Sequence, residues 1–263
     1  MNEAELLFSE ILKCNRSSLY LNKNLRLNKT KAVEISHVLK RRITGEPIQY
    51  ILGKTEFMGM EFKVTPDVLI PRPETEILVE VVIKLVNSFS STHQALKILD
   101  IGTGSGCIAI SLAKLLTNVE IYAVDVSEKA LQVAKENAKL NKVKINFFQN
   151  DVLSAISFQP SAFSLIVSNP PYVRAAEINQ LQIEVQREPH IALDGGRDGL
   201  DFYRDIIKYA ARALKNNGYL ALEIGFRQLK GIKNIFHKSN KFEIIEVVKD
   251  YNYIERVVIA KLK

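Results

Sequence analysis

Hydrophobic positions in the last two thirds of the chain form short apolar runs separated by segments with helical spacing. Apolar runs of roughly four to eight residues are typical of buried strands, and they predict strands at 97–101, 120–124, 145–149, 163–168, 218–224, 242–249 and 254–261. Apolar residues three or four apart predict helices between them, at 105–117, 128–140, 199–214 and 226–237. This alternation predicts a parallel sheet with helices on both faces. Only Asp250 to Tyr253 separates the last two strands, which is short enough for an antiparallel hairpin.

The N-terminal part of the chain has a different pattern. Helical spacing appears at residues 3–13 and 30–43, and residues 57–64 predict two short strands about a glycine turn. A further helix is predicted from Thr75 to Phe89, leading into the first strand of the sheet. We therefore expect a helical docking domain over 1–54, a β-hairpin linker over 55–72 and an α/β domain over 73–263.

Composition narrows the class of protein. The 263 residues are 47% hydrophobic and 25% charged, which is typical of soluble globular proteins. Glu3, Glu5 and Glu10 are unlike a signal peptide, and charged residues interrupt the strongest apolar run, 77–86. The two cysteines and four histidines have no motif spacing, so no metal site is expected. These features predict a cytoplasmic protein with no membrane partner.

Positive charge is concentrated at the N-terminus. Residues 1–54 hold ten Lys and Arg against five Glu and no Asp, so +5 of the net +7 lies there. A basic surface suits an anionic partner, either nucleic acid or an acidic protein. Its aromatic residues, Phe8, Tyr20 and Tyr50, are far apart, which favours an acidic protein over single-stranded nucleic acid. For any single lysine, a solvated helix surface is the simpler explanation.

Residues 98–106, ILDIGTGSG, combine a strand, a glycine-rich turn and the start of a helix. Glycines let a backbone approach a ligand closely, and this arrangement binds nucleotides in doubly wound folds. Asp125 ends the next strand, where a carboxylate can accept hydrogen bonds from both ribose hydroxyls. The pair of features fits a dinucleotide as well as S-adenosylmethionine, and a turn used only for close packing is a further alternative. The G-x-G-x-G spacing differs from the G-x-G-x-x-G expected for a pyrophosphate. Together with Asn169-Pro170-Pro171-Tyr172 one strand further along, it favours S-adenosylmethionine.

The strand 163–168 continues directly into Asn169-Pro170-Pro171-Tyr172. The two prolines fix φ and remove two N–H donors, and the residues before them are restricted to extended geometry. The turn can therefore hold a planar NH2 group through Asn169 Oδ1 and a backbone carbonyl, with Tyr172 as a flat wall. This suits an enzyme that alkylates amide or exocyclic amino nitrogens. An ordinary strand-ending Asn-Pro turn is the alternative when the motif is taken alone.

Together these motifs resemble the PrmC/HemK family of peptide-chain-release-factor glutamine N5-methyltransferases, over nearly the whole chain. Asn-Pro-Pro-Tyr alone is shared with many amino-methyltransferases, whereas Ile-Pro-Arg-Pro-Glu-Thr together with Asp-Gly-Gly is more particular. The matching segments are 45–50, 69–76, 98–106, 168–172, 188–189, 192–196, 198–200, 250–251 and 255–256.

The resemblance implies an α/β fold: a Rossmann-like seven-stranded S-adenosylmethionine-dependent methyltransferase sheet, with a small N-terminal helical domain and a β-hairpin linker. The implied substrate is the glutamine of the Gly-Gly-Gln loop in class-1 peptide-chain release factors. The expected catalytic residues are Asn169, Pro170 and Tyr172, and Pro171 and Arg72 join them in binding the substrate. The expected cofactor-binding residues are Asp100, Gly102, Thr103, Gly104, Ser105, Gly106, Asp125, Asp151, Val152 and Asn169. Asp151 would hold the adenine amino group, although a helix or turn cap is an equal alternative.

Two other functions are compatible with the motifs. The first is a DNA or RNA amino-methyltransferase that flips a base into the same turn, although residues 1–54 are a thin recognition domain with few aromatics. The second is a non-catalytic protein that binds translation factors with a relic methyltransferase domain. The intact motifs argue against such decay.

Overall fold

The structure, a computed structural model, describes residues 3–21, 27–89, 95–150 and 161–263. Its main sheet has seven strands in the order β5-β4-β3-β6-β7-β9-β8. The strands are β3 (Leu96–Ile101), β4 (Val119–Asp125), β5 (Asn146–Gln149), β6 (Phe163–Ser168), β7 (Leu214–Glu223), β8 (Phe242–Lys249) and β9 (Glu255–Leu262). The pairs from β5 to β7 are parallel, and β9 runs antiparallel to both β7 and β8.

The chain starts the sheet at β3, builds outward to β4 and β5, and then returns to β6 on the other side of β3. Ligands of open α/β sheets bind outside the carboxyl ends of the strands at such a reversal. The fold therefore places a crevice beyond the ends of β3, β4 and β6.

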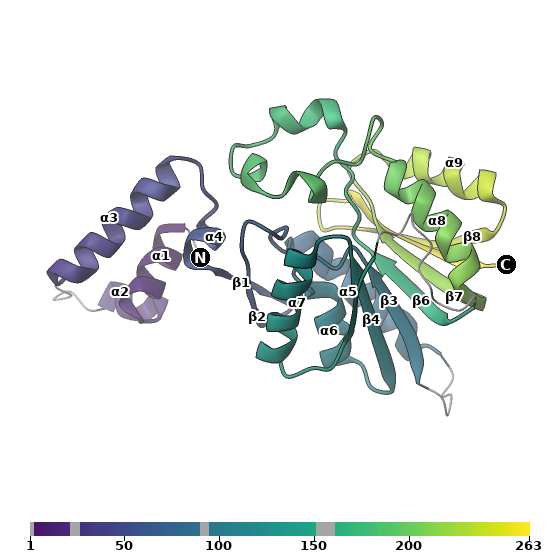
Figure 1. The fold of residues 1–263 in the computed structure, drawn as a ribbon, viewed down its shortest axis with the longest axis horizontal. Helices are drawn as coiled ribbons and strands as arrows, with labels where there is room; N and C mark the ends of the chain where they lie inside the picture. The colour runs from purple at the N-terminus through teal and green to yellow at the C-terminus, as the bar shows by residue number, and fades with distance from the viewer. Residues whose placement is uncertain (1–2, 22–26, 90–94, 151–160) are drawn as a thin grey trace.

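Helices cover both faces of the sheet (Figure 1). One face carries α5 (Pro73–Asn87), α6 (Cys107–Leu115) and α7 (Glu128–Leu140), and the other carries α8 (Asp201–Ala213) and α9 (Leu229–Ser239). Alternate strand residues enter two separate cores: Ile98 and Leu165 pack toward α5 and α6, whereas Leu99 and Ile166 pack toward α8 and α9. The central strands β3 and β6 are mostly hydrophobic because both of their sides are buried.

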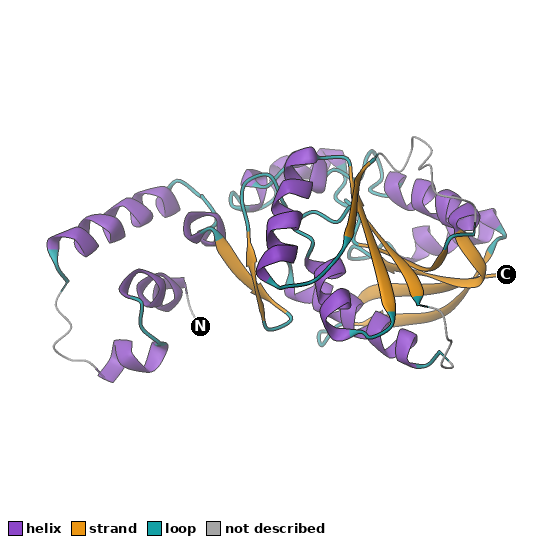
Figure 2. Cartoon of the chain, turned by 60° about the horizontal axis from the view of Figure 1, so that its bottom comes forward, coloured by secondary structure: helices purple, strands orange, loops and turns teal. Residues whose placement is uncertain are grey.

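The N-terminal helices are α1 (Glu3–Leu12), α2 (Arg16–Leu21), α3 (Lys29–Ile43) and α4 (Ile48–Leu52). They enclose a small core of Leu7, Ile11, Ile35, Val38 and Ile48. Figure 2 shows them set apart from the sheet, with a two-stranded hairpin in between. The helical domain expected at the N-terminus is therefore present in the described residues.

The hairpin consists of β1 (Lys54–Phe57) and β2 (Met60–Lys63). Phe57 and Phe62 are buried in the core beneath α5. The Asn137 side chain on α7 accepts the Lys63 N–H (2.7 Å) and donates to the carbonyls of Lys63 and Ser105 (both 2.9 Å). The hairpin predicted as a linker is thus packed into the α/β domain and tied to the glycine turn.

Every strand and helix predicted from periodicity is present, with ends that differ by a few residues. The largest shift is in β7, which begins at Leu214 rather than at 218. Periodicity missed α2, α4 and the 3-10 turns η1 (Ala175–Gln180), η2 (Val185–Arg187) and η3 (His190–Ala192), which are all too short to show a repeat. Within the described ranges, no helix has both the length and the apolar character needed to cross a membrane.

Candidate active site

A cavity of about 260 Å³ opens at the carboxyl ends of β3, β4 and β6. Of the residues predicted for the site, Gly102, Gly104, Asp125, Asn169, Pro170 and Pro171 line it. The structure therefore brings the glycine turn, the acid after β4 and the double-proline turn to one place, although 67 residues separate Gly102 from Asn169 in the sequence.

The glycine turn presents bare backbone to this cavity. Gly102 and Gly104 have φ of +72° and +55°, and a Cβ built on either would meet nothing within 4 Å. Gly106 differs, because its Cβ would lie 2.9 Å from Ile110 Cδ1 and 3.1 Å from Ala134 Cβ. The first two glycines leave space for a ligand, whereas Gly106 allows α6 and α7 to pack closely.

Asp125 lines the cavity beside the glycine turn and is hydrogen-bonded to the backbone of that turn. Its Oδ2 accepts the Gly104 N–H (2.8 Å), and its Oδ1 accepts the Ser127 N–H (2.9 Å). Burial raises the pKa of Asp125, and these backbone donors counteract the rise. A carboxylate has roughly four lone-pair sites, so each oxygen can still accept a hydroxyl from a ligand.

Asp100 lies beneath the glycine turn and does not line the cavity. Its side chain is fully buried, and its Oδ2 accepts a hydrogen bond from Thr103 Oγ1 at 2.7 Å. Among the described residues, none donates to its buried Oδ1. Burial raises the pKa of Asp100 to about 7, against the Thr103 hydrogen bond that lowers it. Thr103 and Ser105 are likewise buried beneath the turn, so these three residues support the cavity from behind.

Asn169 enters the cavity at the end of β6 with its amide held in one orientation. Its Nδ2 donates to Thr75 Oγ1 on α5 at 3.0 Å. In the described part of the chain, no donor is bonded to its Oδ1, so the oxygen is available to a ligand. The neighbouring Ser168 hydroxyl donates to the Ile101 carbonyl (2.7 Å) and fixes the end of β6 to that of β3.

Tyr172 does not line the cavity, and its ring packs against Gly225, where a Cβ would lie 2.9 Å from Tyr172 Cδ2. Burial raises the pKa of Tyr172 to about 12, so the phenol is neutral at physiological pH. Its position behind the double-proline turn supports that turn directly. Contact of the ring with a bound substrate remains a prediction.

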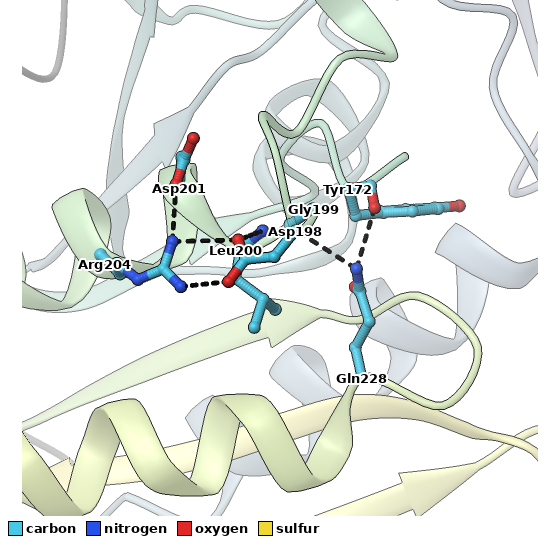
Figure 3. A network of polar contacts seen from close by, with 7 residues as sticks. All are labelled: Tyr172, Asp198, Gly199, Leu200, Asp201, Arg204 and Gln228. Atoms are coloured by element: carbon cyan, nitrogen blue, oxygen red, sulfur yellow. Dashed lines mark hydrogen bonds and ion pairs between the residues drawn. The ribbon is translucent and has the colours of Figure 1, made fainter. Parts of the chain in front are cut away.

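The Tyr172 backbone is held by two neighbouring segments (Figure 3). Gln228 Nε2 donates to the carbonyls of Tyr172 (2.9 Å) and Gly199 (3.1 Å), and its Oε1 accepts the Gly225 N–H (3.0 Å). A Cβ on Gly199 would lie 2.5 Å from the Tyr172 carbonyl oxygen, and one on Gly195 would lie 2.8 Å from Tyr172 Cα. Both glycines are needed because the chain passes so close to the turn.

Several cavity residues were not predicted. They come from the segment before α5, from the 3-10 region and from α8, and they include Asp67, Val68, Leu69, Pro189, Ile191, Ala192, Phe202 and Ile206. Buried Glu188 joins the first two segments, because its Oε2 accepts the Ile70 N–H (3.0 Å) and its Oε1 pairs with Arg72. Of these wall residues, Leu69, Pro189 and Ala192 lie inside the family motifs, and the others had no sequence signal.

The remaining predicted residues are placed as follows. Arg72 is the N-cap of α5 and pairs with Glu188, outside the cavity lining, so direct contact with substrate remains a prediction. Asp151 and Val152 lie outside the described residues. In the described ranges, no cluster of three or more His, Cys, Asp or Glu side chains could hold a metal ion.

The seven-stranded sheet with its antiparallel β9, the glycine turn and the acid at the end of β4 together define a Rossmann-like S-adenosylmethionine-dependent methyltransferase. Two solved structures share this fold. One is a methyltransferase from Pyrococcus furiosus (TM-score 0.55, 17% identity, 89% of this chain and 98% of that chain). The other is the ribosomal protein L11 methylase from Lactobacillus delbrueckii subsp. bulgaricus (TM-score 0.52, 22% identity, 76% and 84%). Identities this low show the fold alone.

Sequence relatives give the particular family. Residues 76–187 match the Methyltransferase small domain and residues 1–53 match the PrmC N-terminal domain. The chain is 43% identical to the release factor glutamine methyltransferase of Thermodesulfovibrio yellowstonii over 99% of this chain and 92% of the relative. It is 45% identical to that of Flavobacterium psychrophilum over 92% and 85%. The chain belongs to the release factor glutamine methyltransferase family, as its motifs suggested.

The cavity fits S-adenosylmethionine, the cofactor of this class of enzyme. Gly102 and Gly104 would let the methionine part approach the backbone, and the spare lone pairs of Asp125 suit the two ribose hydroxyls. Apolar residues next to Asp125, including Val126 and Ala130, offer a surface for the flat adenine. The contact of each of these residues with the cofactor stays a prediction.

Asp125→Ala should weaken cofactor binding by at least about tenfold, because hydrogen bonds to a charged group contribute about 1.5–3 kcal/mol each. Single-turnover transfer at saturating cofactor should change much less, since these bonds are the same in the ground and transition states. Calorimetry with S-adenosylmethionine measures the dissociation constant. Glu128→Ala, an exposed acid on α7 outside the cavity lining, is the matched control. An unchanged dissociation constant for Asp125→Ala would remove this residue from the site.

Asp100 should make the cofactor-free protein less stable as the pH rises. Its carboxyl titrates near pH 7 when folded and near pH 3.9 when unfolded, so folding takes up a proton between these values. The contribution of this group to the free energy of unfolding therefore falls as pH rises through that window. Asp100→Asn should be more stable than the unmodified chain at pH 8.5, by on the order of a few kcal/mol, and the gap should shrink toward pH 4.5. Urea unfolding at both pH values is the measurement, and parallel pH dependences for the two proteins would contradict it.

Proposed function

We propose that this chain transfers a methyl group from S-adenosylmethionine to the side-chain N5 of the glutamine in the Gly-Gly-Gln motif of class-1 release factors. The family carries the reaction type, since full-length relatives are named release factor glutamine methyltransferases. The observation that carries the proposal within this structure is the orientation of Asn169, whose amide NH2 is bonded to Thr75. Its oxygen is thereby left to accept from a substrate NH2 group.

The methyl transfer depends mainly on how the glutamine nitrogen is positioned relative to the methyl group. A carboxamide nitrogen is a weak nucleophile because its lone pair is delocalised into the carbonyl. S-adenosylmethionine, when bound, supplies a strongly electrophilic methyl group on its sulfonium. Asn169 Oδ1 and the Pro170 carbonyl would each accept one N–H of the glutamine, which fixes the nitrogen toward the methyl group.

These two acceptors would also stabilise the positive charge that develops during the transfer. As the new N–C bond forms and the S–C bond breaks, positive charge develops on the amide nitrogen, and two preorganised oxygens stabilise it. The methylated amide is acidic and afterwards loses one N–H proton to solvent. The product is an N5-methylglutamine, and no side chain is required as a base at the outset.

We further propose that the N-terminal helical domain docks the release factor. Its excess of +5 charges suits an acidic protein surface. The domain also contacts the segment after the double-proline turn, since Arg42 pairs with Glu184 (2.8 Å) and Arg187 donates to the Thr44 carbonyl (3.0 Å). A protein held by these helices would therefore lie beside the cavity. On this proposal the partner is a protein, with no stable nucleic-acid complex and no membrane.

Asn169→Ala should keep cofactor binding and lose most methyl transfer. Removal of one preorganised hydrogen-bonding group from an active site costs about 2.7–4 kcal/mol, a loss of roughly 10²–10³ in kcat. The measurement is turnover on purified release factor with labelled S-adenosylmethionine, beside calorimetry of cofactor binding. The same labelled assay with DNA and RNA tests the amino-methyltransferase alternative. Turnover near that of the unmodified chain would exclude the role assigned to Asn169.

The docking proposal predicts a selective effect on substrate affinity. Lys29 and Lys40 are exposed and three helical turns apart on α3, so they lie on the same side of that helix. The double variant Lys29→Glu/Lys40→Glu should raise the KM for release factor several-fold with kcat and cofactor affinity unchanged. The effect should shrink with salt, because exposed charges are screened beyond about 8 Å at physiological ionic strength. Lys233→Glu/Lys238→Glu on α9 makes the same charge change elsewhere, and equal KM values for the two variants would refute docking by α3.

A further inference from the structure

The Asn169 amide can be useful in only one of two orientations. A side-chain amide has an oxygen at one end, which accepts, and an NH2 group at the other, which donates. If the group were rotated by half a turn, it would present N–H to the N–H of the substrate. Something in the fold must therefore hold the orientation that places Oδ1 toward the cavity.

The contact that holds it comes from α5. Asn169 Nδ2 donates to Thr75 Oγ1 at 3.0 Å, and Thr75 is buried in the first turn of that helix with 2% of its surface exposed. The Thr75 hydroxyl also lies against the carboxyl group of Glu223, the last residue of β7, where its hydrogen-bonding lowers the pKa of that carboxyl. Glu223 is 1% exposed, and among the described residues its Oε2 has no hydrogen-bond partner.

The direction of these hydrogen bonds follows from their chemistry. An ionised carboxylate can only accept, so a hydrogen bond between Thr75 and Glu223 has to use the single hydroxyl hydrogen of Thr75. The Thr75 oxygen can then only accept a hydrogen bond from Asn169, so Asn169 has to donate with its NH2 group. The carboxylate thus determines, through one hydroxyl, which end of the Asn169 amide faces the cavity.

We propose that Thr75 and Glu223 are positioning residues that hold the Asn169 side chain with Oδ1 toward the substrate amide. The inference rests on the proposed role of Asn169 as an acceptor and adds the two residues that enforce it. Neither residue lines the cavity, so their effect on the reaction passes through Asn169.

The ionisation of Glu223 gives the arrangement a pH dependence. Burial raises the pKa of Glu223 to about 7, and the Thr75 hydrogen bond and the Arg256 charge lower it. The protonated carboxyl can donate to Thr75, which frees the Thr75 hydrogen for Asn169 Oδ1 and removes the preference for the useful orientation. Activity should therefore rise with pH through about 7. Several other titratable or charged groups face Glu223. They are Arg72 just before α5, Glu74 on α5, Cys107 on α6, Tyr172 after β6, Tyr203 on α8 and Arg256 on β9.

Three variants of the full chain test the proposal. Thr75→Val keeps the shape and removes the hydroxyl, Thr75→Ser restores the hydroxyl, and Glu223→Gln replaces the carboxylate with an amide that can itself donate to Thr75. Ser111→Ala is the matched control, since it deletes a buried hydroxyl on α6 that has no hydrogen-bond partner in the described part of the chain. For each variant, kcat and KM on release factor, cofactor affinity and thermal unfolding are measured between pH 6 and pH 8.5.

Thr75→Val should lower kcat by about tenfold or more, with cofactor affinity within about twofold, and Thr75→Ser should recover most of the loss. Glu223→Gln should lower kcat at pH 8 and remove the rise in activity through pH 7, a change that a purely structural role would not produce. If Thr75→Val fails to fold, the pH profile of Glu223→Gln decides the question.

A Thr75→Val enzyme with unmodified kcat, or a Glu223→Gln enzyme that keeps the unmodified pH profile, would overturn the proposal. If Asn169→Ala itself kept full turnover, the proposed function of Asn169 would fail first, so the two failures are distinguishable.

Discussion

Two consecutive prolines deprive the turn after β6 of the backbone donors that would normally hold it. Its position therefore depends on groups from other elements. Gln228 donates to the Tyr172 carbonyl, the Asn169 amide is bonded to Thr75, and the next residue, Val173, accepts from the Gly195 N–H at 2.8 Å. The same lack of donors gives the turn its use, because it presents acceptors to a ligand that brings two N–H groups.

This dependence explains motifs that lie far from the turn in sequence. Gly195 and Gly199 are the points at which later chain segments pass within van der Waals contact of Tyr172, and a side chain at either position would displace the turn. Glu188 joins the 3-10 region to the segment before α5 in a similar way, through Ile70 and Arg72. The motif glycines Gly195 and Gly199 thus support the double-proline turn, and Glu188 supports the neighbouring cavity wall.

Two buried carboxylates lie next to the two motifs of the site, the glycine turn and the double-proline turn. Asp100 lies under the glycine turn and Glu223 behind Asn169, and burial raises the pKa of each to about 7. Burying an acid in this way costs stability once it ionises. Perturbed acids of this kind cluster at functional sites. Asp100 accepts a hydrogen bond from Thr103, and Glu223 has the same role toward Thr75 in our proposal.

Much of this architecture could be predicted from the sequence, and the failures have physical causes. The strands and long helices follow from periodicity, and the glycine turn and Asn169 motif follow from local chemistry at strand ends. The 3-10 region from Ala175 to Ala192 has no periodicity, so no local pattern identifies Ile191 as part of the cavity wall. Asp100, Thr103 and Ser105 do not line the cavity, and their contact with the cofactor stays a prediction. The roles of Thr75 and Glu223 depend on a contact across 148 positions of sequence, which no local pattern contains.

The central claim is that this site methylates one glutamine amide of a release factor. The most direct measurement is the mass of a class-1 release factor after incubation with the chain and S-adenosylmethionine, followed by peptide mapping. We expect a gain of a single methyl group, located on the glutamine of the Gly-Gly-Gln motif and absent when Asn169→Ala replaces the unmodified chain. An unmodified release factor, or a methyl group on any other residue, would contradict it.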